Sequence, residues 1–98
     1  GDSEGKQNNI VFVADCINYG IINEKHTSEQ PMGYIGGIVG CNYKWSEIIN
    51  CINKANVNGT STSIGGIAGI NHYNIKKCYN EGKIESKRTA ISWWYLWI

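Results

Sequence analysis

The sequence predicts an all-β fold, a short parallel β-solenoid of about three coils. A long block, GGIVGCNYKWSEIINCINKANV at residues 36–57, returns as GGIAGINHYNIKKCYNEGKI at residues 65–84. Its second half also occurs earlier, as VADCINYGII at residues 13–22. Short repeats that cannot bury their own apolar face stack on one another and share a core. A β-sandwich or β-roll with antiparallel repeats is the alternative fold.

The spacing of matched residues gives the register between coils. Matched pairs are separated by 29, 27 and 35 positions: Gly36–Gly65, Cys51–Cys78 and Cys16–Cys51. The longest step contains a polar insertion at residues 24–32, and the spacing from glycine to cysteine shrinks by two in the last copy. Insertions in repeats fall in surface loops. We therefore expect a constant set of strands joined by loops of variable length.

Within each copy, matched positions alternate with variable ones. The matched sets are Cys16, Asn18, Gly20 and Ile22; Cys51, Asn53, Ala55 and Val57; and Cys78, Asn80, Gly82 and Ile84. A period of two is typical of a strand with two different faces. We predict that the matched set faces inward and forms one ladder of cysteines, buried as free thiols, and one of asparagines. Stacked amides satisfy each other's hydrogen bonds.

The glycine block shows the same alternation. Ile38, Gly40 and Asn42 match Ile67, Gly69 and Asn71, whereas Val39 and Cys41 are replaced. The matched set, with a ladder of Ile38 on Ile67, is therefore also expected to face inward. One feature breaks the period: Val13, Ile48 and Ile75 match but lie three residues before each ladder cysteine. A bend or bulge is expected between them.

The repeats divide the chain into an incomplete repeat at 10–35, full repeats at 36–64 and 65–88, and a C-terminal cap at 89–98. Residues 1–9 are polar and are expected to be frayed, with the first strand beginning at Ile10. The cap reads TAISWWYLWI. Three interpretations of its aromatic residues are open: a cap over the open end of the core, an exposed platform for a sugar or a partner, or a terminus that is altered by truncation or belongs to an oligomer contact. The candidate binding residues are Trp93, Trp94, Tyr95, Trp97, Tyr43 and Trp45.

The two glycine cores, GGIVG and GGIAG, together with the downstream C-x-N-x-G-x-I pattern, resemble the GLUG motif. The resemblance covers about two thirds of the chain. It implies a tandem, solenoidal module of bacterial surface and secreted proteins, a group that includes immunoglobulin-A-cleaving metallopeptidases. The family repeat has no established catalytic role. The expected location is therefore extracellular or at the bacterial cell surface.

Composition and spacing argue against several kinds of chemistry. Nine basic against eight acidic residues give a net charge of +1, without the basic footprint of nucleic-acid binding. The chain has no apolar run long enough to insert into a membrane. The four cysteines are 25, 10 and 27 positions apart, unlike the close pairs of zinc sites. A disulfide remains open for an exported protein, although stacked strands hold Cβ atoms too far apart.

We therefore expect no metal, cofactor or catalytic residue, and no enzymatic activity. A nucleophilic cysteine would need a partnering base, and no acids recur in register as a hydrolase pair would require. The expected function is a structural or adhesive module whose loops at 24–32, 43–47 and 72–74 contact a host protein or glycan. The alternative is an accessory segment of an exported peptidase or glycan hydrolase whose catalytic domain lies elsewhere.

Overall fold

The computed structural model describes residues 1–24, 33–60 and 63–86, which form short β-strands and no helix. The first coil contains β1 (Asp2–Ser3), β2 (Val11–Ala14), β3 (Ile17–Asn18) and β4 (Ile22–Asn23). The second contains β5 (Tyr34–Gly36), β6 (Val39–Asn42), β7 (Ser46–Ile49), β8 (Ile52–Asn53) and β9 (Val57–Gly59). The third contains β10 (Ser63–Gly65), β11 (Ala68–Asn71), β12 (Ile75–Lys76), β13 (Tyr79–Asn80) and β14 (Ile84–Ser86).

Every strand pairs in parallel with its counterpart in the next coil, and the second coil lies in the middle of the stack. The sheets are β1-β6-β11, β10-β5, β12-β7-β2, β13-β8-β3 and β14-β9-β4. Gly36 aligns with Gly65, and Asn53 aligns with both Asn18 and Asn80, at the offsets expected from the sequence. The parallel β-solenoid is therefore confirmed, and the antiparallel alternative is wrong.

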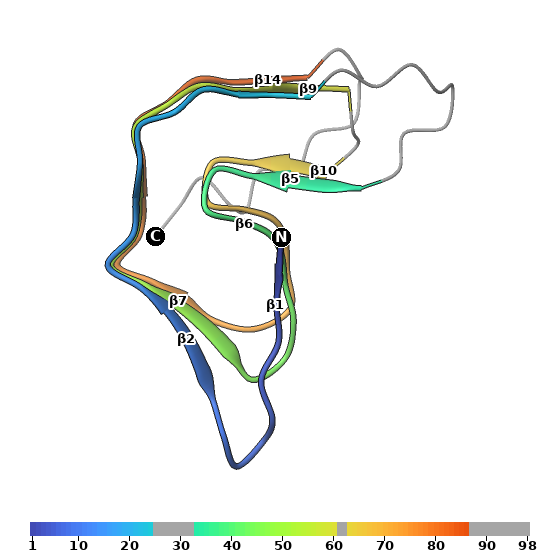
Figure 1. Cartoon of the computed structure of the whole chain (residues 1–98), viewed down its shortest axis with the longest axis vertical. Coiled ribbons are helices and arrows are strands. Elements are labelled where there is room, and N and C mark those ends of the chain that lie inside the picture. The colour runs from blue at the N-terminus through green and yellow to red at the C-terminus, as the bar shows by residue number, and fades with distance from the viewer. Residues whose placement is uncertain (25–32, 61–62, 87–98) are drawn as a thin grey trace.

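The cross-section of one coil has two lobes (Figure 1). Strand β9 forms the top, β5 runs back beneath it, and a turn at residues 36–38 leads into β6. Strands β7 and β8 then close the lower lobe and rise again to β9. The lower core consists of Val39, Ile48, Cys51, Ile67, Ala68 and Cys78, with Val13, Ile38 and Ile75 packed against it. Both members of the predicted isoleucine ladder, Ile38 and Ile67, therefore contact this core.

From β8 to β9 the predicted alternation is present. Cys51, Asn53, Ala55 and Val57 are buried, whereas Lys54 and Asn56 are exposed. The prediction fails at β6, where all four residues are buried. A side chain at Gly40 would come within 2.8 Å of the Tyr34 carbonyl oxygen in β5. The matched glycine therefore faces a neighbouring backbone and Val39 faces the core, because β6 is covered on both sides.

The predicted bend before each ladder cysteine is a single residue with left-handed backbone. Asp15, Asn50 and Lys77 have φ angles of 57°, 55° and 52°, and each immediately precedes its cysteine. One such residue turns the chain, so that side chains three positions apart both point inward. Asp and Asn tolerate this conformation, whereas it is strained for Lys.

The N-terminal segment differs from the expectation of frayed coil. Residues Asp2–Ser3 form β1, which aligns with Cys41 and Asn42 of β6. The Ser3 hydroxyl donates to Asn42 Oδ1 at 2.6 Å, and the Gly1 carbonyl accepts from the Gly40 amide at 2.6 Å. The first coil is thus longer than the sequence pattern indicated.

The amide of Asn53 uses all of its hydrogen-bonding capacity. Its Nδ2 donates to the Asn80 Oδ1 of the third coil at 2.8 Å and to the Ala55 carbonyl at 2.8 Å. Its Oδ1 accepts from Asn18 Nδ2 of the first coil at 2.9 Å and from the Ala55 amide at 3.4 Å. The residue therefore links three coils and closes its own turn, as the ladder prediction required.

The second glycine of the pair in each full repeat packs directly on this ladder. A Cβ at Gly37 would lie 2.5 Å from Asn53 Cγ, and a Cβ at Gly66 would lie 2.5 Å from Asn80 Oδ1. These distances are too short for any side chain, so the turn between β5 and β6 can reach the asparagine wall only with glycine. The glycine turn and the asparagine ladder, which are the two most distinctive parts of the repeat, therefore contact each other directly.

Replacing Asn53 with Ala is expected to destabilise the domain by about 2–4 kcal/mol, because several buried groups lose their partners. Urea unfolding measures this loss. The control is Asn58→Ala on the same coil, where one exposed bond to Asn23 Oδ1 is removed and a loss below about 1 kcal/mol is expected. Equal losses in the two variants would contradict the central role of the ladder.

Replacing Lys77 with Asn is expected to stabilise the domain by about 0.5–1 kcal/mol, because Asn adopts left-handed backbone at lower cost. Lys77→Gln removes the same charge without that preference and should leave stability unchanged. Thermal melting of the three proteins distinguishes backbone strain from charge; a Gln variant as stable as the Asn variant would exclude the strain explanation.

Candidate functional site

The corner between β6 and β7 is where the coils differ most. Asp2, Cys41 and Ile70 align at its start, and Val13, Ile48 and Ile75 align at its end. From start to end, the chain advances 11 residues in the first coil, 7 in the second and 5 in the third. The corner therefore widens toward the first coil, whose loop projects at the lower end of the molecule (Figure 1).

Two aromatic pairs join the second and third coils at this position. The rings of Tyr43 and His72 stack with centroids 5.8 Å apart and an interplanar angle of 14°. The rings of Trp45 and Tyr73 are tilted by 53° with centroids 5.5 Å apart. We call these four residues the aromatic corner. His72 is exposed and the other three are half-buried.

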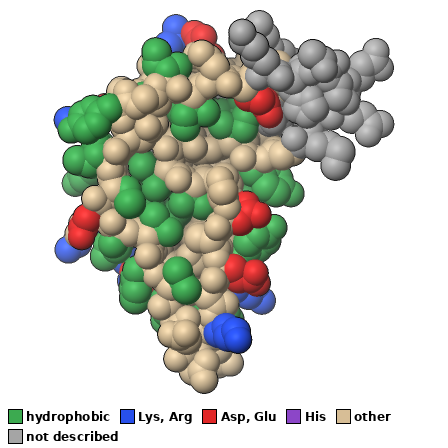
Figure 2. All heavy atoms as spheres, in the orientation of Figure 1, with side chains coloured by type: hydrophobic (Ala, Val, Ile, Leu, Met, Phe, Trp, Pro, Cys, Tyr) green, Lys and Arg blue, Asp and Glu red, His purple; other side chains and the backbone are tan. Residues whose placement is uncertain are grey.

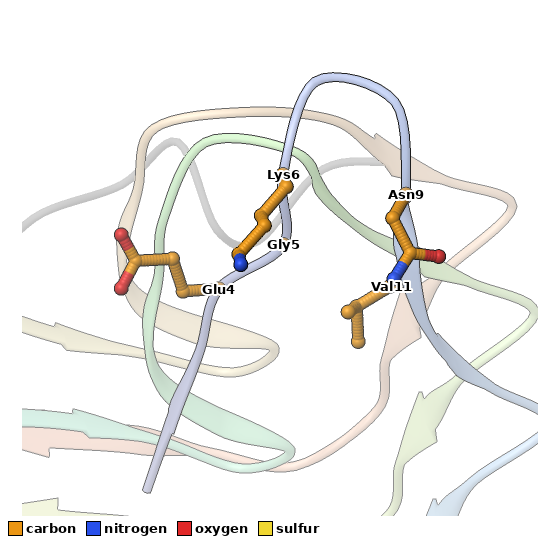
Figure 3. Close-up of a pocket in the computed structure, with 5 residues that line it drawn as sticks. All are labelled: Glu4, Gly5, Lys6, Asn9 and Val11. Carbon is orange, nitrogen blue, oxygen red and sulfur yellow. The ribbon is translucent and has the colours of Figure 1, made fainter.

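Two adjoining hollows flank the aromatic corner. One, of about 330 Å³, is lined by Glu4, Tyr43, Lys44 and His72. The other, of about 440 Å³, is lined by Glu4, Gly5, Lys6, Asn9 and Val11 of the first coil (Figure 3). Glu4 lines both hollows, so together they form one surface with aromatic rings, a carboxylate and two ammonium groups. Such a surface can contact a ligand that has both polar and apolar parts.

Backbone contacts hold the first-coil loop against the corner. The Gly5 amide donates to the Lys44 carbonyl at 3.2 Å, and the Val11 amide donates to the Trp45 carbonyl at 3.0 Å. Trp45 itself has a φ of 62°, which is strained for a bulky residue. Strained backbone of this kind is often found at functional sites. The loop and the tryptophan thus form a fixed unit.

Hydrogen bonding and burial suppress ionisation beneath this surface. A hydrogen bond to the Cys41 thiol is the main factor that raises the pKa of Tyr43. Burial raises the pKa of Cys41, which is 1% exposed. Both groups therefore stay neutral near pH 7, and the formal charges around the hollows are those of Glu4, Lys6 and Lys44.

The cysteine ladder is buried only in part. Cys51 and Cys78 are fully buried, and their thiols donate to the carbonyls of Ile49 at 3.3 Å and Lys76 at 3.2 Å. Cys16 is exposed, contrary to expectation, because its coil lies at the end of the described stack. All four cysteines are free thiols.

The structure describes only some of the predicted binding residues. Tyr43 and Trp45 lie at the aromatic corner, beside the loop at residues 72–74 that was also expected to make contacts. The residues Trp93, Trp94, Tyr95 and Trp97, the cap at 89–98 and residues 25–32 of the insertion lie outside the described residues. The sequence pattern did not indicate the part played by Glu4 and its neighbours, because DSEG resembles neither of the segments beside which it stacks.

A band of outward side chains lies on β3, β8 and β13. The exposed rings and aliphatic groups here include Ile17, Tyr19 and Tyr79. Lys54 Nζ lies 5.9 Å from the centroid of the Tyr19 ring and 3.8 Å from Glu81 Oε2. Hydrophobic side chains alternate with charged ones along this edge of the molecule (Figure 2). This flank is a second exposed surface, with a composition that differs in every coil.

The chain matches the family described as the GLUG motif over residues 33–58 and 60–85. The two matched segments cover more than half of the chain, which therefore belongs to the GLUG motif family. No curated protein and no solved structure matches it.

Two kinds of feature are absent from the described segments. Residues 1–24, 33–60 and 63–86 contain no group of three or more His, Cys, Asp or Glu residues that could hold a metal ion. No helix long and apolar enough to cross a membrane occurs in this part of the chain.

Burial raises the pKa of the Cys51 thiol from its ordinary 9.0 to about 11. Between those values the unfolded chain loses the proton more readily than the folded one, so stability should fall as pH rises from 9 to 11. Urea unfolding across this range measures the slope. Cys51→Ala lacks the thiol and should show a shallower decline, by up to about 1.4 kcal/mol per pH unit; parallel curves would contradict the prediction.

Proposed function

We propose that the chain is a non-catalytic structural or adhesive repeat module of a bacterial cell-surface or secreted protein, which displays its corner loops for contact with a host protein or glycan. The observation that carries this proposal is the separation of roles within each coil. The inward positions repeat and are joined by hydrogen bonds between coils, whereas the outward positions and the corner between β6 and β7 differ in every coil. A rigid core thus supports a surface that is free to vary.

The aromatic corner supports a binding role in particular. Aromatic rings provide a large contact area at low entropic cost, and neighbouring polar groups confer orientation and specificity. Here, Tyr43 and His72 lie beside Glu4 and Lys44 around one hollow. The resemblance to GLUG modules of surface and secreted proteins favours the same interpretation.

The proposal is tested by screening the intact protein against arrays of glycans and host surface proteins. For any hit, His72→Ala and Trp45→Asn should weaken binding at least about tenfold, which corresponds to about 1.4 kcal/mol. Asn suits the left-handed backbone at position 45, so this variant removes the ring without adding strain.

The matched control is Tyr79→Ala, which removes an exposed ring from the β3–β8–β13 flank. Binding should be unchanged in this variant. Equal weakening by all three substitutions would place the contact elsewhere. If no hit appears while the protein remains folded, the adhesive part of the proposal is wrong and the module is a spacer.

A further inference from the structure

We propose that the aromatic corner binds a neutral oligosaccharide, with the C–H face of a sugar ring on the Tyr43 and His72 rings and its hydroxyls on Glu4 and Lys44. This inference rests on the proposed function, because it names the ligand class of the surface proposed there. Three properties of the corner carry it: the use of its backbone, the lining of its hollow and its unpaired polar groups.

The backbone of the corner is already used between coils. The Tyr43 amide donates to the Ser3 carbonyl at 2.7 Å. The His72 amide donates to the Asn42 carbonyl, also at 2.7 Å, and the Lys44 carbonyl accepts from an amide of the first coil at 3.2 Å. Peptides that add a strand to a sheet need free backbone groups at its edge, whereas the hydrogen bonds of stacked parallel strands run from coil to coil. On the outer rim of the coils, where the corner lies (Figure 1), side chains therefore make the contacts with a ligand.

The lining of the hollow fits a sugar better than an apolar peptide. Its walls come from Glu4, Tyr43, Lys44 and His72, and no aliphatic residue is among these four. The anchor residues of a protein partner are usually buried in a desolvated pocket. A sugar ring instead has a C–H face that packs on an aromatic ring and an edge of hydroxyls. The volume of about 330 Å³ lies at the lower end of the range for small-ligand sites, which suits a short oligosaccharide.

The two rings form one wall across two coils. Tyr43 belongs to the second coil and His72 to the third, and their planes differ by only 14° with centroids 5.8 Å apart. Nearly parallel rings at this separation are offset rather than directly superposed. The pair therefore offers a wider apolar surface than a single ring, on which the C–H face of a sugar can rest.

The polar groups of the hollow have no partner of their own. Among the described residues, the side chains of Glu4, Lys44 and His72 make no hydrogen bond or ion pair. Elsewhere on the coils, charged side chains pair with each other at 3.8, 3.2 and 2.8 Å, in Lys54–Glu81, Lys76–Glu47 and Lys83–Glu85. A carboxylate accepts hydrogen bonds and an ammonium donates them. The corner thus has a partner for each role of a sugar hydroxyl.

The charges of the hollow favour a neutral sugar over an acidic one. The formal charges of Glu4 and Lys44 cancel, so the hollow lined by the rings gives an anion no long-range attraction. Glu4 also lines the adjoining hollow, where its side chain extends away from Asn9 and Val11 (Figure 3). An acidic group in either hollow would therefore lie near a like charge, whereas neutral hydroxyls would form charge-assisted hydrogen bonds with the carboxylate.

NMR titration of the intact protein with a panel of oligosaccharides tests the ligand class. The panel contains neutral hexose and N-acetylhexosamine oligomers and their uronic-acid counterparts. We expect at least one neutral oligomer to bind and to shift the ring protons of Tyr43 and His72, with an affinity that added salt leaves unchanged. If only acidic oligomers bind, or if host proteins bind and no sugar does, the proposed function stands and this inference is wrong. If neither sugars nor proteins bind, this inference and the adhesive part of the proposed function are both wrong.

A pair of carboxylate substitutions tests the polar contact. Glu4→Gln keeps the shape of an exposed side chain but replaces a charged acceptor with a neutral one, so it should weaken binding of a neutral oligomer about fivefold. Glu81→Gln makes the same change outside the corner and should leave the affinity unchanged. Stronger binding by the Glu4 variant would indicate an anionic ligand and overturn the proposal.

A pair of ring substitutions tests the apolar contact. His72 is exposed, so both variants should keep the native circular dichroism spectrum. His72→Phe retains an aromatic ring and should bind within about threefold of the native protein, whereas His72→Leu lacks the ring and should bind about tenfold more weakly. Equal affinity of the two variants would exclude the contact between sugar and ring.

Discussion

The structure depends on one interaction, the hydrogen bonds of the Asn53 amide inside the stack. This side chain is fully buried, and a buried amide is tolerated only when its donors and acceptors are all paired. Each partner comes from a fixed position: the same residue in the coil before, the same residue in the coil after, and the backbone two residues on. The ladder therefore determines the register of all three coils together.

The glycine turn follows from the ladder. The chain must fold back as β5 to fill the upper lobe, and its turn meets the asparagine wall at residues 37 and 66. No other residue leaves room there. The amide and the second glycine of each pair are thus in direct contact, which explains why they recur together in the sequence.

Much of the fold was predictable from the sequence because each matched residue stacks on its counterpart in the neighbouring coil. The offsets of the Cys, Asn and Gly positions gave the strand pairing, and the break in alternation located the left-handed residue before each cysteine. The assignment of β6 was wrong because alternation reveals two different faces but not which of them meets the core. Residues Asp2–Ser3 were missed because the strand uses a serine hydroxyl where the other coils use an amide.

The candidate site was predictable only in part. Tyr43 and Trp45 stood out as aromatic residues in a loop, but their partners His72 and Tyr73 lie 29 and 28 positions later, whereas the ladder offset is 27. Unequal loops in neighbouring coils shift such pairs, so identity at a fixed spacing does not reveal them. The contribution of Glu4 depends on the first-coil loop, which no other copy resembles.

The unequal corner has a consequence for how such repeats diverge. Across this corner the residue offset between stacked strands falls from 39 to 35 for the first two coils and from 29 to 27 for the last two. Insertions and deletions at this corner leave the contacts inside the coils in place. Changes in the length of the loop therefore cost the fold little stability there. A search for a strict sequence period would overlook relatives of this chain, whereas a search for the paired glycine and asparagine signatures with an elastic gap between them would find them.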